Sequence, residues 1–400
     1  MAIRILSIQS KQGLLRLFRD LKVDPYGISI MLPKAVPYCI RIDALSCIAA
    51  NILKQEMLSA GGDAALPRGA LTGKTRSTDC VLIGNLSQFS KLIEKLRKQP
   101  FGLAKLGVDI KASVAKYAKQ SFTLSLRRNR LHLGGRPKIM GIMNLTPDSF
   151  SGDGLYARQN DIGNIVECAQ TMVRDGADLI DIGGESSRPG ANPVPVKEEL
   201  RRTIPAIKAI AKKVKVPLSI DTYKPDVARA ALDNGASMIN DISGLRNREM
   251  VSVAKKYKAA VVIMHMQRTP QTMQKNPRYG CVTADVIKYL NDRVAASLDA
   301  GIGAENIVID PGIGFGKTIS HNLKLLRGLK EFKILGLPIM VGTSRKGFIG
   351  ALTGADAGQR IPGTIASCVL AVNNGAHIVR VHDVKQIKQA LQVTRAVLND

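Results

Sequence analysis

The chain has 400 residues, of which 45% are hydrophobic, so it is long enough for two domains with buried cores, and global disorder is excluded. Its net charge of +26 favours anionic partners, but the chain has no Trp and few aromatic residues, so we expect no specific nucleic acid partner. No apolar run approaches the roughly 18 residues that cross a bilayer, so we expect no membrane segment and a cytoplasmic protein.

Residues 1–125 are typical of a smaller α/β domain. Strands are predicted at 4–9, 38–43 and 79–84, and helices at 11–21, 44–60 and 87–99. The stretch GALTGKTR at 69–76 has the wrong spacing for a nucleotide-binding phosphate loop, so no activity is predicted for this domain. The basic segment 126–137 ends in Gly-Gly-Arg-Pro and is predicted to be a linker.

From residue 138 onward, short apolar runs alternate with longer amphipathic stretches, which indicates repeated strand–helix units. The predicted strands are 138–144, 178–183, 217–222, 237–242, 259–265, 306–310, 338–344 and 377–382. The predicted helices are about 160–175, 197–213, 225–234, 247–257, 282–300, 321–330, 361–374 and 383–398. Eight such units in residues 138–400 predict a (β/α)8 TIM barrel, an α/β fold that follows the smaller domain.

Polar residues stand at the carboxyl end of nearly every predicted strand. They are Asn144, Asp181, Asp221, Asn240, Asp241, His265, Asp310, Ser344, Arg345, Lys346, Arg380 and His382. A single polar residue after a strand is more often a turn or cap residue than a functional one. In a barrel, however, these ends meet at one mouth, so the whole set predicts a ligand site there.

The chemistry of this set indicates two kinds of recognition. Carboxylates and amides on one side of the mouth, among them Asp221 and Asn240, accept hydrogen bonds from a heterocycle rich in N–H groups. Cations on the other side, among them Lys346 and Arg380, hold phosphate. Asn144 offers an oxygen ligand to Mg²⁺, which usually binds few protein groups.

Several of these stretches resemble one family. NLTPDSFSGDG, DIGGESSRPGA, SIDT, INDI, MHMQ, DPGIGFGK, GTSRKGFIG and RVHDV appear in the order of dihydropteroate synthases. The resemblance covers residues 139 to about 384 and implies the same barrel, a pterin diphosphate and 4-aminobenzoate as substrates, and Mg²⁺ as cofactor. It also implies release of diphosphate, formation of 7,8-dihydropteroate for folate synthesis, and a homodimer formed through the last helices.

The resemblance implies a role for each matching residue. Asp221, Asn240, Met264, Asp310 and Lys346 would bind the pterin, and Asn144 would bind Mg²⁺; Arg380 and His382 would hold the diphosphate, and Ser187, Arg188, Pro189, Phe150 and Phe315 would shape the aminobenzoate pocket. Asp148 or Asp181 would stabilise the carbocation that remains when diphosphate leaves. The catalytic set is therefore Asp148, Asp181, Lys346, Arg380 and His382.

Two departures and two alternatives accompany this interpretation. Gly347 stands where many members have Ser, which removes a hydroxyl contact to the aminobenzoate carboxylate, and SGDG replaces SDGG around Asp153. One alternative is a pterin-dependent methyltransferase of the same fold, which has no diphosphate to expel. The other is a non-catalytic pterin-binding protein, which would not need both the Mg²⁺ ligand and the diphosphate cations.

Overall fold

The computed structural model describes residues 3, 4, 6, 11–72, 74–127, 129–146, 162–188 and 190–399. The chain forms two compact units, Met1–Ala115 and Lys116–Asp400. The first unit therefore ends before residue 125, where sequence analysis placed the boundary. Most of the strand predicted at 4–9 lies outside the described residues.

The first unit contains a three-stranded antiparallel sheet. Its order is β1 (Pro37–Ser46), β3 (Ser77–Asn85) and β2 (Asp63–Ala65). The helices are α1 (Lys11–Asp20), α2 (Pro25–Met31), α3 (Cys47–Ser59), α4 (Arg68–Leu71), α5 (Leu86–Leu96) and α6 (Leu103–Ala118), with a 3-10 turn η1 (Leu32–Lys34). Leu53, Leu82, Phe89 and Leu92 are buried together where the helices meet the sheet. The strands predicted at 38–43 and 79–84 and all three predicted helices are present.

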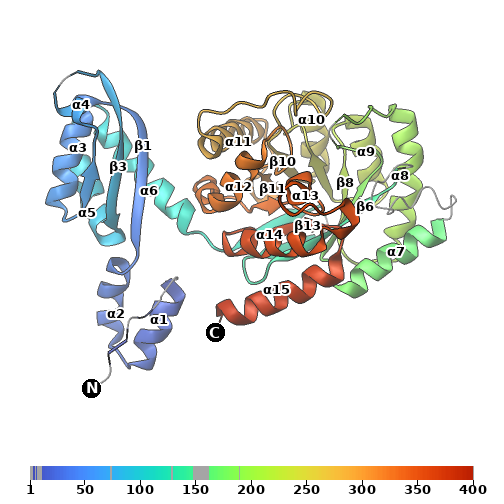
Figure 1. Cartoon of the computed structure of the whole chain (residues 1–400), viewed down its shortest axis with the longest axis horizontal. Helices are drawn as coiled ribbons and strands as arrows, with labels where there is room; N and C mark the ends of the chain where they lie inside the picture. The colour runs from blue at the N-terminus through green and yellow to red at the C-terminus, as the bar shows by residue number, and fades with distance from the viewer. Residues whose placement is uncertain are drawn as a thin grey trace. The chain divides into compact units, whose positions relative to one another are not determined.

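The second unit contains eight parallel strands arranged in a ring (Figure 1). They are β6 (Lys138–Asn144), β7 (Leu179–Gly183), β8 (Leu218–Asp221), β9 (Met238–Asp241), β10 (Ala260–Met264), β11 (Ile307–Asp310), β12 (Met340–Val341) and β13 (Ile378–Val381). The strands from β6 to β11 pair in chain order, β12 pairs with β13, and β13 pairs with β6. A parallel bridge between Ile309 and Ile339 joins β11 to the start of β12, so the sheet closes into the predicted barrel.

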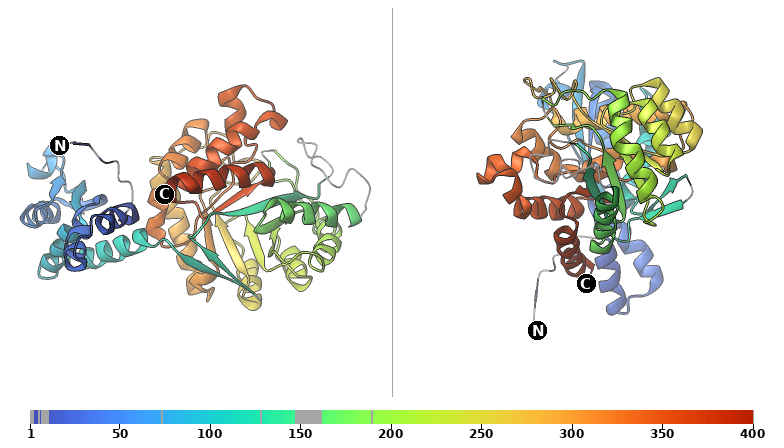
Figure 2. Two further views of the ribbon diagram at one scale, coloured as in Figure 1. Left: turned by 90° about the horizontal axis from the view of Figure 1, so that it is seen from below. Right: turned by 90° about the vertical axis from the view of Figure 1, so that its right-hand side faces the viewer.

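Helices surround this ring of strands in every view (Figures 1 and 2). They are α7 (Ile162–Asp175), α8 (Val196–Ile210), α9 (Pro225–Asp233), α10 (Arg248–Tyr257), α11 (Val282–Asp299), α12 (Ile319–Arg327), α13 (Gly347–Thr353), α14 (Ile361–Asn373) and α15 (Val384–Asn399), with 3-10 turns η2 (Ala304–Asn306), η3 (Leu329–Leu335) and η4 (Ala357–Gln359). All eight predicted helices are present, and the short α13 was not predicted. None of the described helices combines the length and apolar character that a membrane span needs.

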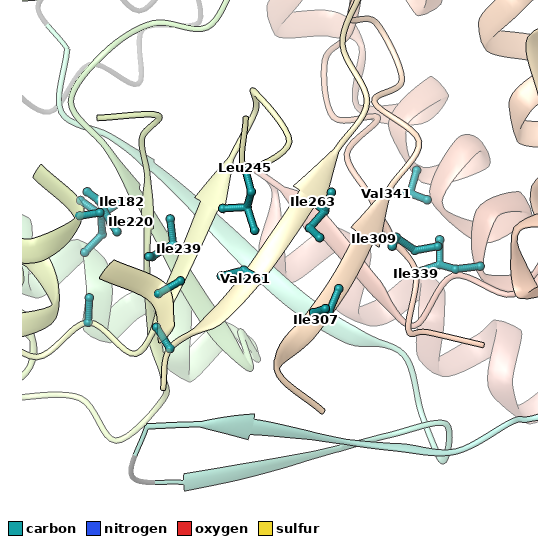
Figure 3. Packing of buried hydrophobic residues seen from close by; sticks show 14 of the residues in the cluster. Ile182, Ile220, Ile239, Leu245, Val261, Ile263, Ile307, Ile309, Ile339 and Val341 are labelled. Atoms are coloured by element: carbon teal, nitrogen blue, oxygen red, sulfur yellow. The ribbon is translucent and has the colours of Figure 1, made fainter. Parts of the chain in front are cut away.

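Alternate residues of each strand face opposite sides of the barrel wall. Ile182, Ile220, Ile239, Ile263 and Ile309 face the helices and form one large apolar cluster with them (Figure 3). The intervening residues face the interior of the barrel. This alternation leaves the inward positions at the strand ends free to carry polar groups, while the outward positions supply the burial that stabilises the barrel.

A hairpin closes the other end of the barrel. Its strands are β4 (Phe122–Leu126) and β5 (Asn129–Leu133), drawn in teal at the bottom of Figure 3. Leu124, Leu126 and Leu133 are at most 2% exposed and pack with apolar side chains from the first residues of the barrel strands, such as Met238 and Ile378.

The hairpin corrects the sequence interpretation, because residues 126 and 129–133 of the segment predicted as a linker lie in strands. Leu124, Leu126, Leu131 and Leu133 alternate with polar and basic residues, which is the period of a strand with one buried face. The basic run at 127–130 interrupts this period in the sequence, and for this reason the two strands were not predicted.

Candidate active site

A cavity of about 670 Å³ opens at the carboxyl ends of the barrel strands. Among the residues predicted from sequence, those that line it are Asn144, Ser187, Arg188, Asp221, Asn240, Met264, Asp310, Phe315, Lys346, Arg380 and His382. Asp181 is fully buried and is not among the lining residues. Asp148, Phe150, Asp153 and Pro189 lie outside the described residues.

Arg380 on β13 connects two acidic groups at the base of the cavity. Its Nε lies 2.6 Å from Asp181 Oδ2 on β7, and its Nη2 lies 2.6 Å from Asp221 Oδ2 on β8. Asn240 on β9 donates to the same Asp181 oxygen at 2.9 Å. The expected separation of acids and cations is therefore wrong for Arg380, because the guanidinium lies between the carboxylates it was expected to face.

Three buried polar atoms in this region have no hydrogen-bond partner among the described residues: Asp181 Oδ1, Asn240 Oδ1 and Ser219 Oγ. An unpaired buried acceptor costs roughly 1–3 kcal/mol, so such atoms are normally satisfied by a water or a ligand. The carboxylate oxygen of Asp181 and the carboxamide oxygen of Asn240 can only accept a hydrogen bond. The base of the cavity thus favours a ligand or water that donates N–H or O–H groups.

Two of the acids that line the cavity, Asp221 and Asp310, are protonated more readily than ordinary carboxyl groups. Burial raises the pKa of Asp221 to about 7, although the charge of Arg380 opposes the shift; the charge of Asp181 adds to it. Burial also raises the pKa of Asp310 to about 6, against the backbone N–H of Gly312, which donates to Asp310 Oδ1 at 2.7 Å. Strongly shifted acids in one cavity are a common property of functional sites.

Lys346 presents its ammonium group to the same cavity. Its Nζ lies 3.9 Å from the centre of the Phe315 ring, a cation–π contact. The pKa of Lys346 is lowered to about 8. Burial is the main cause and the charge of Arg380 adds to it, whereas the charge of Asp310 opposes the shift.

His382 is neutral in this site rather than cationic as the sequence interpretation assumed. Burial lowers its pKa to about 3, and the charges of Arg380 and Arg345 contribute. Its Nδ1 lies 2.9 Å from Ser344 Oγ, which fixes the imidazole orientation. Four cations lower the pKa of this imidazole: Arg380, Arg345, Lys346 and Arg188. Sequence spacing does not show that they gather around it, so the neutral state of His382 could not be predicted.

The glycine-rich loop after β11 approaches the neighbouring loop closely. Gly312 has a φ of +69°, and a Cβ atom there would lie 1.9 Å from the carbonyl oxygen of His265. Only glycine fits such a position. The loop then brings Phe315 into an apolar cluster with Ile242, Met264 and Met273, which provides a flat apolar wall for a ligand.

An ionic network holds the loop that carries Ser187 and Arg188. Lys224 forms ion pairs with Glu185 and Glu199, and the Tyr223 hydroxyl donates to Glu185 at 2.8 Å. The amide of Val194 also donates to Glu185, at 3.0 Å. This network anchors both ends of the loop on α8 and on the turn after β8, an arrangement that sequence analysis did not predict.

Comparison with known proteins agrees with this site. Residues 140–382 match the family described as "Pterin binding enzyme". The chain is 45% identical over 263 residues to the dihydropteroate synthase of Escherichia coli (strain K12), covering 66% of this chain and 92% of that protein. The chain belongs to the dihydropteroate synthase family.

Solved structures of dihydropteroate synthases have the same barrel. The Xanthomonas albilineans enzyme with 4-aminobenzoic acid is 43% identical, with a TM-score of 0.65, over 70% of this chain and 99% of that one. The Burkholderia cenocepacia enzyme complexed with 7,8-dihydropteroate is 42% identical, with a TM-score of 0.62, over 70% and 97% of the two chains.

One relative extends the similarity beyond the synthase barrel. The probable bifunctional folylpolyglutamate synthase/dihydropteroate synthase of Halobacterium salinarum is 39% identical over 379 residues, covering 94% of this chain and 44% of that protein. A match of this length must include most of the first unit. That unit therefore has a counterpart in a larger dihydropteroate synthase protein.

The surroundings of Asn144 are compatible with its predicted role as a ligand of Mg²⁺. Asn144 lines the cavity, and its Oδ1 and the Asp221 side chain both lie close to Gly183. Among the described residues there is no cluster of three or more His, Cys, Asp or Glu that would hold a metal by itself. An isolated amide oxygen suits Mg²⁺, which keeps waters and substrate oxygens as its other ligands.

Several residues that line the cavity were not predicted from sequence, and Lys317, Met273 and Arg360 are among them. Lys317 belongs to the quoted DPGIGFGK stretch, so its position at the end of a glycine-rich loop was an available signal. Met273 and Arg360 stand outside every motif, and only the folded chain brings them to the mouth. Gly347 also lines the cavity, with open space around the position of a Cβ atom.

Proposed function

We propose that this chain is a dihydropteroate synthase that condenses 7,8-dihydropterin-6-ylmethyl diphosphate with 4-aminobenzoate, giving 7,8-dihydropteroate and diphosphate. The observation that carries the proposal is the pairing, in one cavity, of buried acceptors with buried cations: Asp221 and Asp310 beside Lys346 and Arg380. The similarity to the dihydropteroate synthases of Escherichia coli and Burkholderia cenocepacia supports the proposal. A methyltransferase has no diphosphate to hold and would not need this cationic set.

The pterin ring is proposed to lie on the acidic base of the cavity. Asp221 and Asp310, when ionised, each accept hydrogen bonds from ring N–H and amino groups, and Asn240 accepts through its free Oδ1. Met264, which is 4% exposed, packs against the ring face. On binding, the pterin replaces Arg380 at Asp221, while the bond from Arg380 Nε to Asp181 keeps the guanidinium in place.

The diphosphate is proposed to lie against the cations released in this way. Arg380 directs its remaining N–H groups to the leaving group, and Lys346 moves from the Phe315 ring to the same charge. His382, neutral in the free site, contributes a ring N–H as a hydrogen-bond donor. Preorganised donors of this kind stabilise charge that develops as the leaving group departs.

The bond from the pterin methylene carbon to the diphosphate oxygen breaks first, because the aryl amine is a weak nucleophile. The electron pair leaves with diphosphate, and the electron-rich pterin stabilises the carbocation together with Asp181; Asp148, outside the described residues, stays a predicted contributor. The amine lone pair then forms the new C–N bond and its proton passes to solvent. Mg²⁺, held by Asn144 when bound, would neutralise part of the diphosphate charge.

The 4-aminobenzoate is proposed to bind between Phe315 and the loop that carries Ser187 and Arg188. The apolar wall around Phe315 suits the benzene ring, and the Arg188 guanidinium suits the negative charge of the substrate. Phe150 and Pro189 stay predicted members of this pocket. Homodimer formation also stays a prediction; Leu370, Val393 and Val397 of the last two helices are at least 55% exposed and offer an apolar surface for it.

The cytoplasmic location also stays a prediction. Sedimentation of the purified full chain would test the homodimer, and an unchanged monomer mass at micromolar concentration would refute it.

Release of diphosphate by the full chain tests the proposed function. We expect release to require the pterin diphosphate and Mg²⁺, and 7,8-dihydropteroate to form only when 4-aminobenzoate is added. Lys346→Ala should lower kcat/KM about tenfold or more, because it removes a charge-assisted contact. A wild-type chain that binds the pterin but forms no dihydropteroate would be the non-catalytic protein, and the proposal would fail.

A further inference from the structure

Lys317, in the loop between β11 and α12, is a buried cation that the proposed reaction does not use. Only 3% of its surface is exposed. Its Nζ donates to the carbonyl oxygens of Gly312 and Phe315, both at 2.9 Å, and to that of His265 at 3.3 Å. A fourth atom, His265 Nδ1, lies 2.9 Å away. We call these four acceptors the Lys317 cage.

The imidazole in the cage accepts when Lys317 is an ammonium ion, because Nζ then has no lone pair to receive a proton. Burial lowers the pKa of His265 to about 2, and the charge of Lys317 contributes, so the ring is neutral. An edge contact with Tyr289, at 4.8 Å between ring centres, holds its orientation. Burial also lowers the pKa of Lys317, to about 7, although Asp310 raises it. Four acceptors around Nζ fit the ammonium form, which has three protons to donate.

The cage joins two loops at the rim of the cavity. His265 follows β10, while Gly312, Phe315 and Lys317 follow β11. Other side chains hold the remaining carbonyl groups of the second loop: the Tyr279 hydroxyl donates to Gly316 at 2.7 Å. The backbone of Phe315, however, is tied to Lys317 Nζ directly. Loss of the ammonium group would therefore release the carbonyl groups of Gly312 and Phe315, and the backbone of Phe315 would keep only its amide bond to Gly312.

The strands hold two of the proposed pterin-binding groups independently of the cage. Asp221 and Asn240 end β8 and β9 and are paired in register. Asp310 ends β11 and accepts from the amide of Gly312, whose carbonyl group belongs to the cage, and the charge of Lys317 also lowers the pKa of Asp310. A change in the cage should therefore reach the pterin only through Asp310, whereas it acts directly on the backbone of Phe315.

We infer that Lys317 is a positioning residue that fixes the Phe315 ring through the cage and thereby determines the affinity for 4-aminobenzoate rather than for the pterin. The inference rests on the proposed function, because it assigns Phe315 to the aromatic amine. Lys317 itself does not need to touch either substrate. Its charge acts on the loop, and the loop presents the ring.

Lys317→Met tests the inference, since methionine has a similar length but no charge. With saturating pterin diphosphate, we expect the KM for 4-aminobenzoate to rise about tenfold or more, while the calorimetric Kd for the pterin changes by less than about threefold. Lys324→Met is the matched control, because Lys324 is exposed on α12. Equal losses for both substrates, or an unchanged KM, would overturn the inference.

Chemical rescue separates positioning from a general loss of structure. Propylammonium replaces the atoms missing in Lys317→Ala, and the cavity gives it access to the cage. We expect it to lower the raised KM about threefold or more, whereas 1-propanol, of the same size without charge, should have no effect. Equal effects of the two compounds would contradict a role for the ammonium group.

Two outcomes need their own controls. His265→Leu replaces Lys317→Met if the latter fails to fold, because it removes one acceptor and retains the lysine. It should raise the KM for 4-aminobenzoate about threefold, and an unchanged KM would refute the cage.

Wild-type turnover in the same assay distinguishes the two proposals. Without it the proposed function fails, whereas normal turnover with an unaffected KM in the variants rejects only the role of Lys317.

Discussion

Arg380 Nη2 lies 2.6 Å from Asp221 Oδ2, although the two residues are 159 positions apart in the chain. Their strands, β13 and β8, are separated in the barrel by β6 and β7. The ion pair therefore crosses the interior of the barrel. In the free protein, the cation proposed to hold diphosphate and the acid proposed to bind the pterin form an ion pair with each other, so a substrate that binds both must separate them.

The acid of this pair makes pterin binding depend on pH. Asp221 accepts two hydrogen bonds only when it is ionised, and its pKa in the free site is raised to about 7. Pterin affinity should therefore increase as the pH rises through about 7, and decrease by up to tenfold per unit below it. Calorimetry between pH 5 and 8.5 measures this. Asp221→Asn should bind more weakly and lose the step near 7; a step that persists would assign it to another group, such as Asp310.

The base of the pair should contribute to stability as well as to activity. Arg380→Ala leaves Asp181 and Asp221 buried without their cation, which should lower the free energy of unfolding by about 3–5 kcal/mol. It should also lower kcat/KM about tenfold or more. Denaturant unfolding and steady-state kinetics measure the two effects. A variant with wild-type stability would show that water or ions replace the guanidinium at no cost.

A serine at position 347 should restore a contact that this chain lacks. No atom lies within 4 Å of the position of a Cβ on Gly347, so the side chain fits without strain. We expect Gly347→Ser to lower the KM for 4-aminobenzoate about threefold or more, because the hydroxyl can donate to its carboxylate. Gly347→Ala is the control for the added carbon. Equal KM values for the two variants would exclude the hydroxyl contact.

The hairpin should determine where the barrel can be shortened. A chain that begins at Lys116 keeps β4 and β5, whereas one that begins at Arg136 loses Leu124, Leu126 and Leu133. Burial of three such side chains is worth roughly 5 kcal/mol, so the shorter chain should unfold at much lower denaturant concentration. Pterin binding by the longer chain should be retained. Equal stability of the two chains would refute a structural role for the hairpin.

The amino-acid sequence by itself determined the barrel and most of its mouth. Apolar runs separated by amphipathic helices can close only a few ways, and a polar residue that ends a buried parallel strand is directed to one end of the barrel. For this reason Asn144, Asp221, Asn240 and Asp310 could be predicted to share a cavity, and the structure places them there.

Contacts between distant side chains were decided only by the tertiary structure. The pairing of Arg380 with Asp181 and Asp221, the neutral His382 and the cage around Lys317 all depend on burial and on distances between residues of different strands and loops. The leucines of the hairpin pack against residues from several barrel strands, so their partners are known only from the folded barrel. Local sequence sets the period and the ends of each element, whereas charge state and ion pairing depend on what the folded chain brings within a few ångströms and removes from water.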